Sequence, residues 1–290
     1  MKEILDVVYR TINDISLRLD LFLPDNDENP PLIMWIHGGA WMMGDRKWCG
    51  MQGQLKRGYA IASIDYRLST TAPFPACIID CKYALAFLRK NENKYPIDVS
   101  RICVAGDSAG GHLAALMGVT AGHSEWEPES SDCSIQAVID FYGQITFKEE
   151  GKKSSVDDNV IDNLLGESIH TPKGLMIGAI ASPLSYINGN EPPFLIVHGD
   201  KDDIVNIEQS YMLRNELEKY GQNVIMHTVF GGGHGFDCPV EEKFCNGKDN
   251  AVSLATIAQE PNADGPQQNA KQCGTAKEHE KVSVKLYVIL

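Results

Sequence analysis

The sequence lacks the features that would point to a membrane or to nucleic acid. No apolar run approaches the length needed to cross a bilayer, and the first residues, MKEILDVVYR, enter a strand pattern with no signal peptide before them. Positive charge is also scarce, because 39 acidic residues outnumber 26 Lys and Arg and give a net charge of −13. Nucleic acids and anionic lipid surfaces need a basic footprint. We therefore expect no nucleic-acid partner, no membrane span, and a cytoplasmic protein or a secreted one whose signal has been removed.

Cysteines at metal-binding or redox spacing are missing as well. The eight cysteines include no C-x-x-C pair, and no histidines stand at the close, ordered spacing of a zinc site. Cys77 and Cys81 lie four apart on a predicted helix, and Cys103 lies in a predicted strand. We interpret these three as small, reduced core residues. The sequence predicts no metal and no cofactor.

The chain shows no internal repeat, and strand and helix patterns alternate along it. Apolar or alternating runs predict strands, and helical periodicity predicts helices between most of them. We expect strands at 4–9, 15–23, 32–36, 59–64, 102–105, 135–141, 194–197 and 223–230. We expect helices at 45–57, 76–91, directly after residue 110, and at 156–165, 175–180 and 207–220. The first two strands predict a hairpin whose second strand is a half-exposed antiparallel edge. The later order of strand, helix and strand implies right-handed parallel crossovers in a doubly wound α/β sheet.

A serine flanked by glycines lies where a predicted buried strand meets a predicted helix. The stretch Gly106-Asp107-Ser108-Ala109-Gly110 fits the G-x-S-x-G nucleophile elbow, in which a tight turn projects the serine from the sheet edge. Glycines are needed there because side chains at 106 and 110 would strike the neighbouring strand or helix. The helix N-terminus behind Ser108 offers amide hydrogens to a developing oxyanion. The alternative is a glycine-rich turn with a solvated serine.

With this elbow the sequence resembles the α/β-hydrolase superfamily, and the resemblance covers roughly residues 1–237. In that superfamily a serine, an acid and a histidine follow in chain order on loops at the carboxyl ends of strands. His198-Gly199-Asp200-Lys201-Asp202-Asp203 resembles the family's acid loop and implies that Asp202 is the catalytic acid, with Asp203 and Asp200 as rivals. His234, between glycines after the last predicted strand, is the expected base.

A third motif, His37-Gly38-Gly39-Ala40-Trp41, resembles the oxyanion loop of lipases and esterases. By this resemblance the amides of Gly38, Gly39 and Ala109 would bind the oxyanion, and Trp41 and Asp107 would shape the substrate pocket, although Trp41 could equally serve packing. In the same family His37, His112 and His198 are structural. Arg67 and Asp80 are candidates for a buried ion pair.

Together these motifs resemble the hormone-sensitive-lipase-like carboxylesterases, and among them the small bacterial acetyl and feruloyl esterases that act on polysaccharide decorations. The resemblance implies an α/β-hydrolase fold, a mostly parallel eight-stranded doubly wound sheet with helices on both faces. Two departures are Ala40, which replaces a third glycine, and the absence of a long N-terminal cap, which makes lid-dependent action on long lipid chains less expected.

The domain division places one hydrolase domain at 1–240 and a polar tail at 241–290. Within the domain, 143–190 breaks the strand and helix rhythm and is interpreted as a cap-like insertion over the site or as an ordinary surface excursion. The tail is rich in Gly, Asn, Gln, Lys and Asp and predicts loop or disorder, with 282–290 apolar enough to dock as a strand. Alternative interpretations are a cloning or frameshift artefact and an unusual extension.

The expected activity is a serine carboxylesterase acting on short-chain acyl esters, including acetyl or feruloyl esters of carbohydrates. The partners expected are small-molecule or carbohydrate esters, and the oligomeric state, monomer or homodimer, stays open. One alternative is amide hydrolysis by the same three residues, as in arylformamidases or small peptidases. The other is a noncatalytic binding protein on a hydrolase fold.

Overall fold

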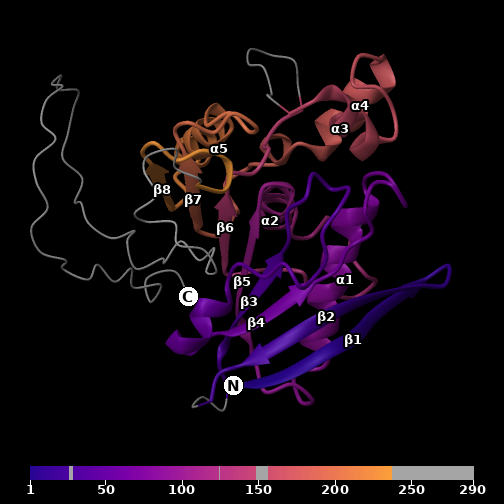
Figure 1. Cartoon of the computed structure of the whole chain (residues 1–290), viewed down its shortest axis with the longest axis vertical. Helices are drawn as coiled ribbons and strands as arrows, with labels where there is room; N and C mark the ends of the chain where they lie inside the picture. The colour runs from indigo at the N-terminus through magenta and orange to yellow at the C-terminus, as the bar shows by residue number, and fades with distance from the viewer. Residues whose placement is uncertain (26–28, 124, 148–155, 237–290) are drawn as a thin grey trace, which may run out of the picture.

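One eight-stranded sheet organises the structure, a computed structural model that describes residues 1–25, 29–123, 125–147 and 156–236. The strand order is β1-β2-β4-β3-β5-β6-β7-β8. The strands are β1 (Lys2–Ile12), β2 (Ile15–Leu23), β3 (Pro31–Ile36), β4 (Ala60–Ile64), β5 (Asp98–Asp107), β6 (Ala137–Phe141), β7 (Phe194–Gly199) and β8 (Val224–Val229). The first three strands in this spatial order pair antiparallel, and every later pair is parallel. The expected α/β-hydrolase sheet is confirmed (Figure 1).

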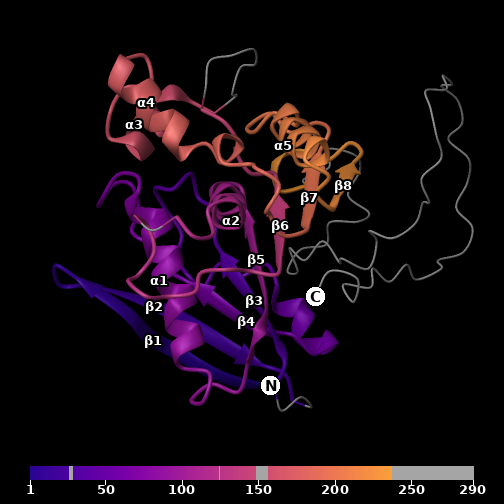
Figure 2. The same ribbon diagram turned by 180° about the vertical axis from the view of Figure 1, so that it is seen from behind.

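The described residues contain five α-helices, and their expected positions are confirmed to within a few residues. They are α1 (Ala76–Lys90), α2 (Ala109–Val119), α3 (Asp158–Leu165), α4 (Pro172–Ala181) and α5 (Glu208–Lys219), with short 3₁₀ helices η1 (Gln52–Arg57), η2 (Pro183–Ser185) and η3 (His234–Phe236). Figures 1 and 2 show α1 and α2 together on one side of the sheet. Because β3 to β8 run parallel, the loops that leave their carboxyl ends gather at one edge.

The central strands are buried on both faces, so neighbouring residues belong to different cores. On one face Met34 of β3 packs in the cluster that contains Leu113 of α2 and Leu213 of α5. The next residue, Trp35, packs in a second cluster with Met51, just before η1. All five α-helices contribute to the first cluster, whereas among the described residues the second face is covered by η1 and the loop before it.

The expected helix at 45–57 is wrong for its first half. Only Gln52–Arg57 is helical, as the 3₁₀ helix η1, and residues 45–51 form turns and irregular backbone. Tertiary bonds outcompete helical ones here: the amide of Arg46 donates to Asp65 Oδ1 over 2.9 Å, and its guanidinium pairs with Asp20 and Asp65. Gly50 lies against the Trp35 indole, where a Cβ would come within 2.9 Å of the ring. Local helical periodicity could not reveal these contacts.

The expected hairpin is confirmed, but the expected edge strand is wrong. β1 forms the edge, and β2 pairs on both sides, with β1 and with β4. The polar residues that alternate along β2 are therefore not all solvated, and Asp20 is buried in its ion pair with Arg46. An alternating pattern marks one polar face, and it does not say whether solvent or an ion pair occupies that face.

The segment 143–190 contributes α3, α4 and η2, which lie beyond the carboxyl end of β6 (Figure 1). Ile161 and Leu164 of α3 pack into the first core cluster, so this part of the segment is anchored to the domain. Its cap-like role stays a prediction, and residues 148–155 are not described. The predicted polar tail lies outside the described residues.

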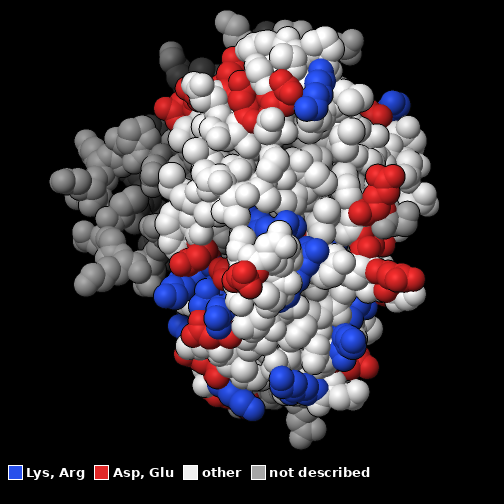
Figure 3. Space-filling view, turned by 90° about the vertical axis from the view of Figure 1, so that its right-hand side faces the viewer, with Lys and Arg blue, Asp and Glu red and all other residues white. Residues whose placement is uncertain are grey.

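Surface charge, helix length and cysteine environment can be compared with the expectations from composition. Figure 3 shows acidic and basic side chains interspersed on one face of the molecule. Helices long and apolar enough to cross a bilayer are not found among the described residues. The expected core thiols are confirmed for Cys77, Cys81 and Cys103, which are free and buried.

Candidate active site

Ser108 occupies a strained turn between β5 and α2, as the elbow motif predicts. Its backbone has φ 52° and ψ −116°, a conformation that L-residues adopt only when the surroundings enforce it. The flanking glycines make the turn possible by close approach. A Cβ on Gly106 would lie 2.3 Å from the Gly110 carbonyl oxygen, and one on Gly110 would lie 2.0 Å from the Ile36 carbonyl oxygen. The packing of β3 against the elbow therefore holds the serine in place.

Three side chains far apart in the sequence meet at this turn. His234 Nε2 lies 3.0 Å from Ser108 Oγ, and His234 Nδ1 lies 2.8 Å from Asp202 Oδ2. Each comes from a loop at the carboxyl end of a parallel strand, after β5, β7 and β8. The imidazole thus bridges a hydroxyl and a carboxylate, the arrangement in which a histidine can take a proton from a serine.

The carboxylate of Asp202 is buried and fully engaged. Its Oδ1 accepts from the amides of Ile204 and Val205, at 2.9 and 2.8 Å. Burial opposes ionisation, but the hydrogen bonds from His198 and His234 and the Val205 amide outweigh it and hold the pKa of Asp202 well below its usual range. Asp202 is therefore an anion wherever the protein is folded near neutral pH.

The two rival carboxylates point elsewhere. Asp200 Oδ1 accepts a 2.6 Å hydrogen bond from the amide of Gly231, which ties the loop after β7 to the loop that carries His234. Asp203 is exposed to solvent. The structure thus brings Asp202, and neither neighbour, to the imidazole of His234.

The predicted oxyanion loop differs from expectation at one amide. The Gly38 N–H donates to Asp107 Oδ1 over 2.9 Å, so this donor is already bound to a side chain. Among the described residues, the amides of Gly39, Ala40 and Ala109 donate to no acceptor. Gly39 has φ +107°, and a Cβ there would lie 2.3 Å from the Met43 carbonyl oxygen. The motif could have suggested Ala40 as an oxyanion donor, because a backbone amide can donate whatever side chain the residue carries.

Comparison with known families agrees with this geometry. The BD-FAE family profile matches residues 19–217, which include the oxyanion loop, the elbow and the acid loop. The chain belongs to the BD-FAE family. The resemblance to hormone-sensitive-lipase-like carboxylesterases inferred from the motifs is confirmed. His234 lies beyond the matched residues, so its assignment depends on the structure and on the glycine-rich loop.

Similar proteins are esterases by name. Esterase LipC of Mycobacterium tuberculosis is 32% identical over 216 residues, which are 71% of this chain and 53% of LipC. A structure titled as a truncated carbohydrate esterase from gut microbiota superposes with a TM-score of 0.73 at 29% identity, covering 81% of this chain and 89% of that one. A bifunctional GH43-CE protein of Bacteroides eggerthii gives 0.72 at 29%, covering 81% of this chain and 36% of that one. The chain spans about half the length of the curated relatives it matches.

The two predicted pocket residues of this BD-FAE protein lie in different surroundings. Trp41 is buried; its Nε1 donates to His112 Nδ1 over 3.1 Å, and its ring packs against Phe147. This favours the packing interpretation of Trp41. Asp107 adjoins the elbow, where burial raises its pKa to about 6, opposed by the Gly38 amide and the charge of His234.

The other polar residues that the sequence of this BD-FAE protein singled out form ion pairs, hydrogen bonds or ring contacts with other residues of the chain. Asp80 is fully buried and accepts from Arg67 through Nε at 2.7 Å and Nη2 at 3.0 Å, so the expected pair exists. His37 stacks on Tyr66, and His112 Nε2 lies 2.8 Å from the Ala181 carbonyl oxygen. Groups of His, Cys, Asp and Glu that could hold a metal ion are not found in the part of the chain that the structure describes.

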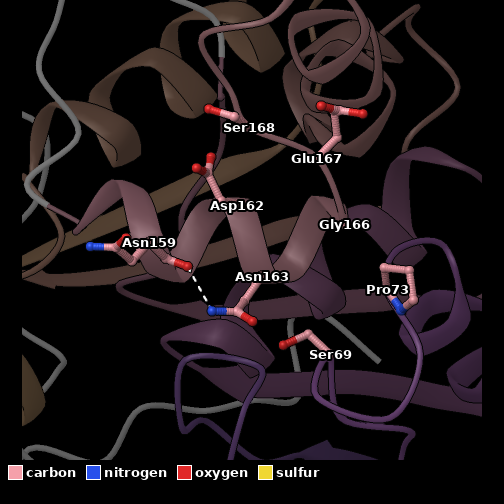
Figure 4. A pocket seen from close by; sticks show the side chains of 8 residues that line it. All are labelled: Ser69, Pro73, Asn159, Asp162, Asn163, Gly166, Glu167 and Ser168. Atoms are coloured by element: carbon pink, nitrogen blue, oxygen red, sulfur yellow. Dashed lines mark hydrogen bonds between the residues drawn. The ribbon is translucent and has the colours of Figure 1, made fainter.

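A cavity of about 390 Å³ lies between α3 and the loop after β4 (Figure 4). Polar side chains and apolar surface contribute about equally to its lining, which consists of Ser69, Pro73, Asn159, Asp162, Asn163, Gly166, Glu167 and Ser168. The Ser69 amide donates to the Trp41 carbonyl oxygen over 2.8 Å, which joins this cavity to the oxyanion loop. Ser69 Oγ is buried and has no partner among the described residues.

Proposed function

We propose that this chain is a carboxylic ester hydrolase in which Ser108, His234 and Asp202 form a catalytic triad. The observation that carries the proposal is the continuous hydrogen-bonded line from Ser108 Oγ through the imidazole of His234 to the buried carboxylate of Asp202. Serine needs such a base to become a nucleophile at neutral pH, and the base needs an anion that stabilises its protonated form.

The reaction follows from the placement of these atoms. Ser108 Oγ attacks the ester carbonyl while its proton passes to His234 Nε2, and Asp202 stabilises the resulting imidazolium. The imidazolium then protonates the leaving alkoxide, which departs as the alcohol and leaves an acyl group on Ser108. Water, deprotonated by His234, attacks the acyl carbonyl, and the serine leaves with the returning proton.

The oxyanion formed in each step needs two or three amides aimed at one point. We assign this role to Gly39 and Ala109, and add Ala40, because these amides are free of other acceptors among the described residues. Gly38, which the sequence also suggested, instead donates to Asp107 and so fixes the loop against the elbow. Its role as an oxyanion donor would require this bond to break.

The proposed substrates are short-chain acyl esters of carbohydrates, with acetyl and feruloyl groups as the candidate acyl groups. Two facts support this class. The relatives named above include a carbohydrate esterase, and the cavity beside the oxyanion loop offers amide and carboxylate side chains next to apolar surface, a mixture that suits the hydroxyls and ring faces of a sugar. Its volume of about 390 Å³ lies within the usual range of small-molecule sites.

The first experiment tests the nucleophile. Ser108→Ala should lower kcat for p-nitrophenyl acetate by roughly 10⁴- to 10⁶-fold with an unchanged unfolding midpoint. A fluorophosphonate probe should label the wild-type chain at Ser108. Retained turnover of Ser108→Ala would remove this serine as the nucleophile, and an unlabelled wild-type chain would favour a noncatalytic binding protein.

The second experiment tests the substrate class. Rates on a chain-length series of p-nitrophenyl esters, acetylated xylan and methyl ferulate should favour the short acyl groups, and formylkynurenine and short peptides serve as the amide comparison. Asn163→Ala removes an exposed side-chain amide that lines the cavity. It should raise KM for acetylated xylan several-fold and leave KM for p-nitrophenyl acetate unchanged. Equal effects on both substrates would separate the cavity from sugar binding.

A further inference from the structure

A second imidazole contacts the carboxylate of Asp202. His198, at the end of β7, is fully buried, and its Nε2 lies 3.2 Å from Asp202 Oδ2 and 2.8 Å from the Val205 carbonyl oxygen. Its Nδ1 lies 2.6 Å from the hydroxyl of Ser210 on α5, which is also fully buried. The triad described above uses none of these contacts.

The partners of His198 fix its tautomer. A carbonyl oxygen only accepts, so the ring nitrogen that faces Val205 carries the hydrogen and Nε2 is the donor. Nδ1 of a neutral ring is then an acceptor, and the Ser210 hydroxyl is placed to donate to it. The single Nε2 hydrogen is shared between the Val205 carbonyl oxygen at 2.8 Å and Asp202 Oδ2 at 3.2 Å.

With His198 included, the carboxylate of Asp202 has four donors around its two oxygens. Oδ2 faces His234 and His198, and Oδ1 faces the amides of Ile204 and Val205. A carboxylate offers about four acceptor positions, so any rotation of this group breaks at least one bond.

We propose that His198, supported by Ser210, is a positioning residue for ester hydrolysis that holds the Asp202 carboxylate in the orientation His234 requires. The inference rests on the proposed function, since it concerns how that triad is held. It places part of the catalytic geometry on β7 and α5, behind the loop that carries Asp202.

The charged and titratable groups around this pair are few among the described residues. Asp202 faces His198 directly, and Asp140 on β6 lies near enough to interact with it electrostatically. Tyr142, after β6, presents its ring edge-on to both imidazoles, with centroids at 6.3 Å from His198 and 4.8 Å from His234. Asp107 interacts by charge with His234. A pH profile of the variants must therefore be compared with wild type rather than interpreted by itself.

The test compares two replacements of His198. In His198→Gln the side-chain amide can present an N–H near the position of Nε2, whereas His198→Met has a similar size and no donor. We expect His198→Met to lose about 10- to 100-fold in kcat, as outer partners of metal ligands typically do, with KM for p-nitrophenyl acetate unchanged. His198→Gln should retain most of the activity.

The pH profile supplies a readout that a merely structural role would not move. Without the His198 N–H, the Asp202 carboxylate can turn away from His234 and stabilises the imidazolium less. The acid limb of kcat/KM, which reports loss of the proton from the base, should therefore move to lower pH in His198→Met and stay near wild type in His198→Gln. Equal losses in both variants, or an unshifted limb in His198→Met, would overturn the proposal.

Serine variants give the matched control. Ser182 is as buried as Ser210 and makes two hydrogen bonds of its own, to the Phe147 amide and the Gly178 carbonyl oxygen. Ser210→Ala should lower kcat several-fold and shift the acid limb in the direction of His198→Met, and Ser182→Ala should leave the limb in place. If the wild-type chain neither hydrolyses esters nor reacts with a fluorophosphonate, the proposed function fails first and the positioning role with it. If wild type does both and the variants behave alike, only the positioning role fails.

Discussion

Burial of Asp140 provides a prediction whose magnitude can be worked from the structure. This residue lies on β6 with no exposed surface, and its Oδ1 accepts a 2.9 Å hydrogen bond from the Gly143 amide. Its Oδ2 has no partner among the described residues. Burial raises the pKa of Asp140 from 3.8 to about 6, although the electrostatic interaction with His198 and the Gly143 amide oppose the shift. The folded protein therefore favours the neutral carboxyl.

The consequence is a stability that depends on pH with a definite sign. In the unfolded chain Asp140 loses its proton near pH 4, whereas in the folded protein it keeps the proton until about pH 6. The unfolded state thus binds fewer protons between these values, and the free energy of unfolding falls as pH rises through this window. A shift of about 2 pKa units corresponds to a loss of about 3 kcal/mol, complete above pH 7.

Asp140→Asn isolates this contribution. The asparagine keeps an Oδ1 acceptor for the Gly143 amide and resembles the neutral carboxyl in size, but it does not titrate. Unfolding by urea at intervals from pH 4 to pH 8 would give the free energy of unfolding of both proteins. We expect the difference, variant minus wild type, to rise by about 3 kcal/mol between pH 4 and pH 7 and then level off. Titrations shared by both proteins, including that of Asp202, cancel in this difference.

A flat difference curve would refute the reasoning, because it would show that Asp140 ionises alike in the folded and unfolded states. A curve that falls with pH would mean that the folded protein stabilises the Asp140 anion. The kinetics of the variant supply a separate check: Asp140 contacts no reacting atom in the proposed mechanism, so KM for p-nitrophenyl acetate should stay unchanged.

Two further predictions concern the site directly. Asp202→Asn should lower kcat by about 10³- to 10⁴-fold, measured with p-nitrophenyl acetate, while the exposed neighbour variant Asp203→Asn should stay near wild type; the reverse order would show that the wrong carboxylate was chosen. Gly110→Ala would place a Cβ 2.0 Å from the Ile36 carbonyl oxygen. It should lower the free energy of unfolding in urea by about 3 kcal/mol or more. Gly53→Ala serves as the control, because a Cβ there meets nothing within 4 Å. Similar costs for the two glycines would contradict the steric argument.

The features that sequence predicted well are those that a short stretch of chain determines. The strands, the α-helices, and the positions of Ser108 and His234 follow from periodicity and from glycines that flank one functional residue. Asp202 required the family pattern as well, since three aspartates stand within four residues and only the fold decides which carboxylate reaches the imidazole.

The features that sequence missed depend on contacts between distant residues. The bond that occupies the Gly38 amide comes from Asp107, 69 positions away, and the bonds that replace a helix at 45–51 come from neighbouring strands and loops. His198 gave no signal beyond its place in a family motif, because its contact with Ser210 exists only once α5 packs beside β7. Such contacts follow from sheet order, which local patterns do not specify.

The register between β3 and β5 ties the nucleophile to the oxyanion amides. Ile36 pairs with Gly106 in the sheet, so β3 and β5 reach the site edge at the same level, and their next residues lead into the oxyanion loop and the elbow. The carbonyl of Ile36 also bounds the space that Gly110 leaves empty. One set of backbone contacts therefore places both Ser108 and the Gly39 amide. A change that shifts β3 against β5 by even a fraction of an ångström should lower kcat before it unfolds the protein, because the amides must meet an oxyanion at hydrogen-bond distance while the sheet tolerates the shift.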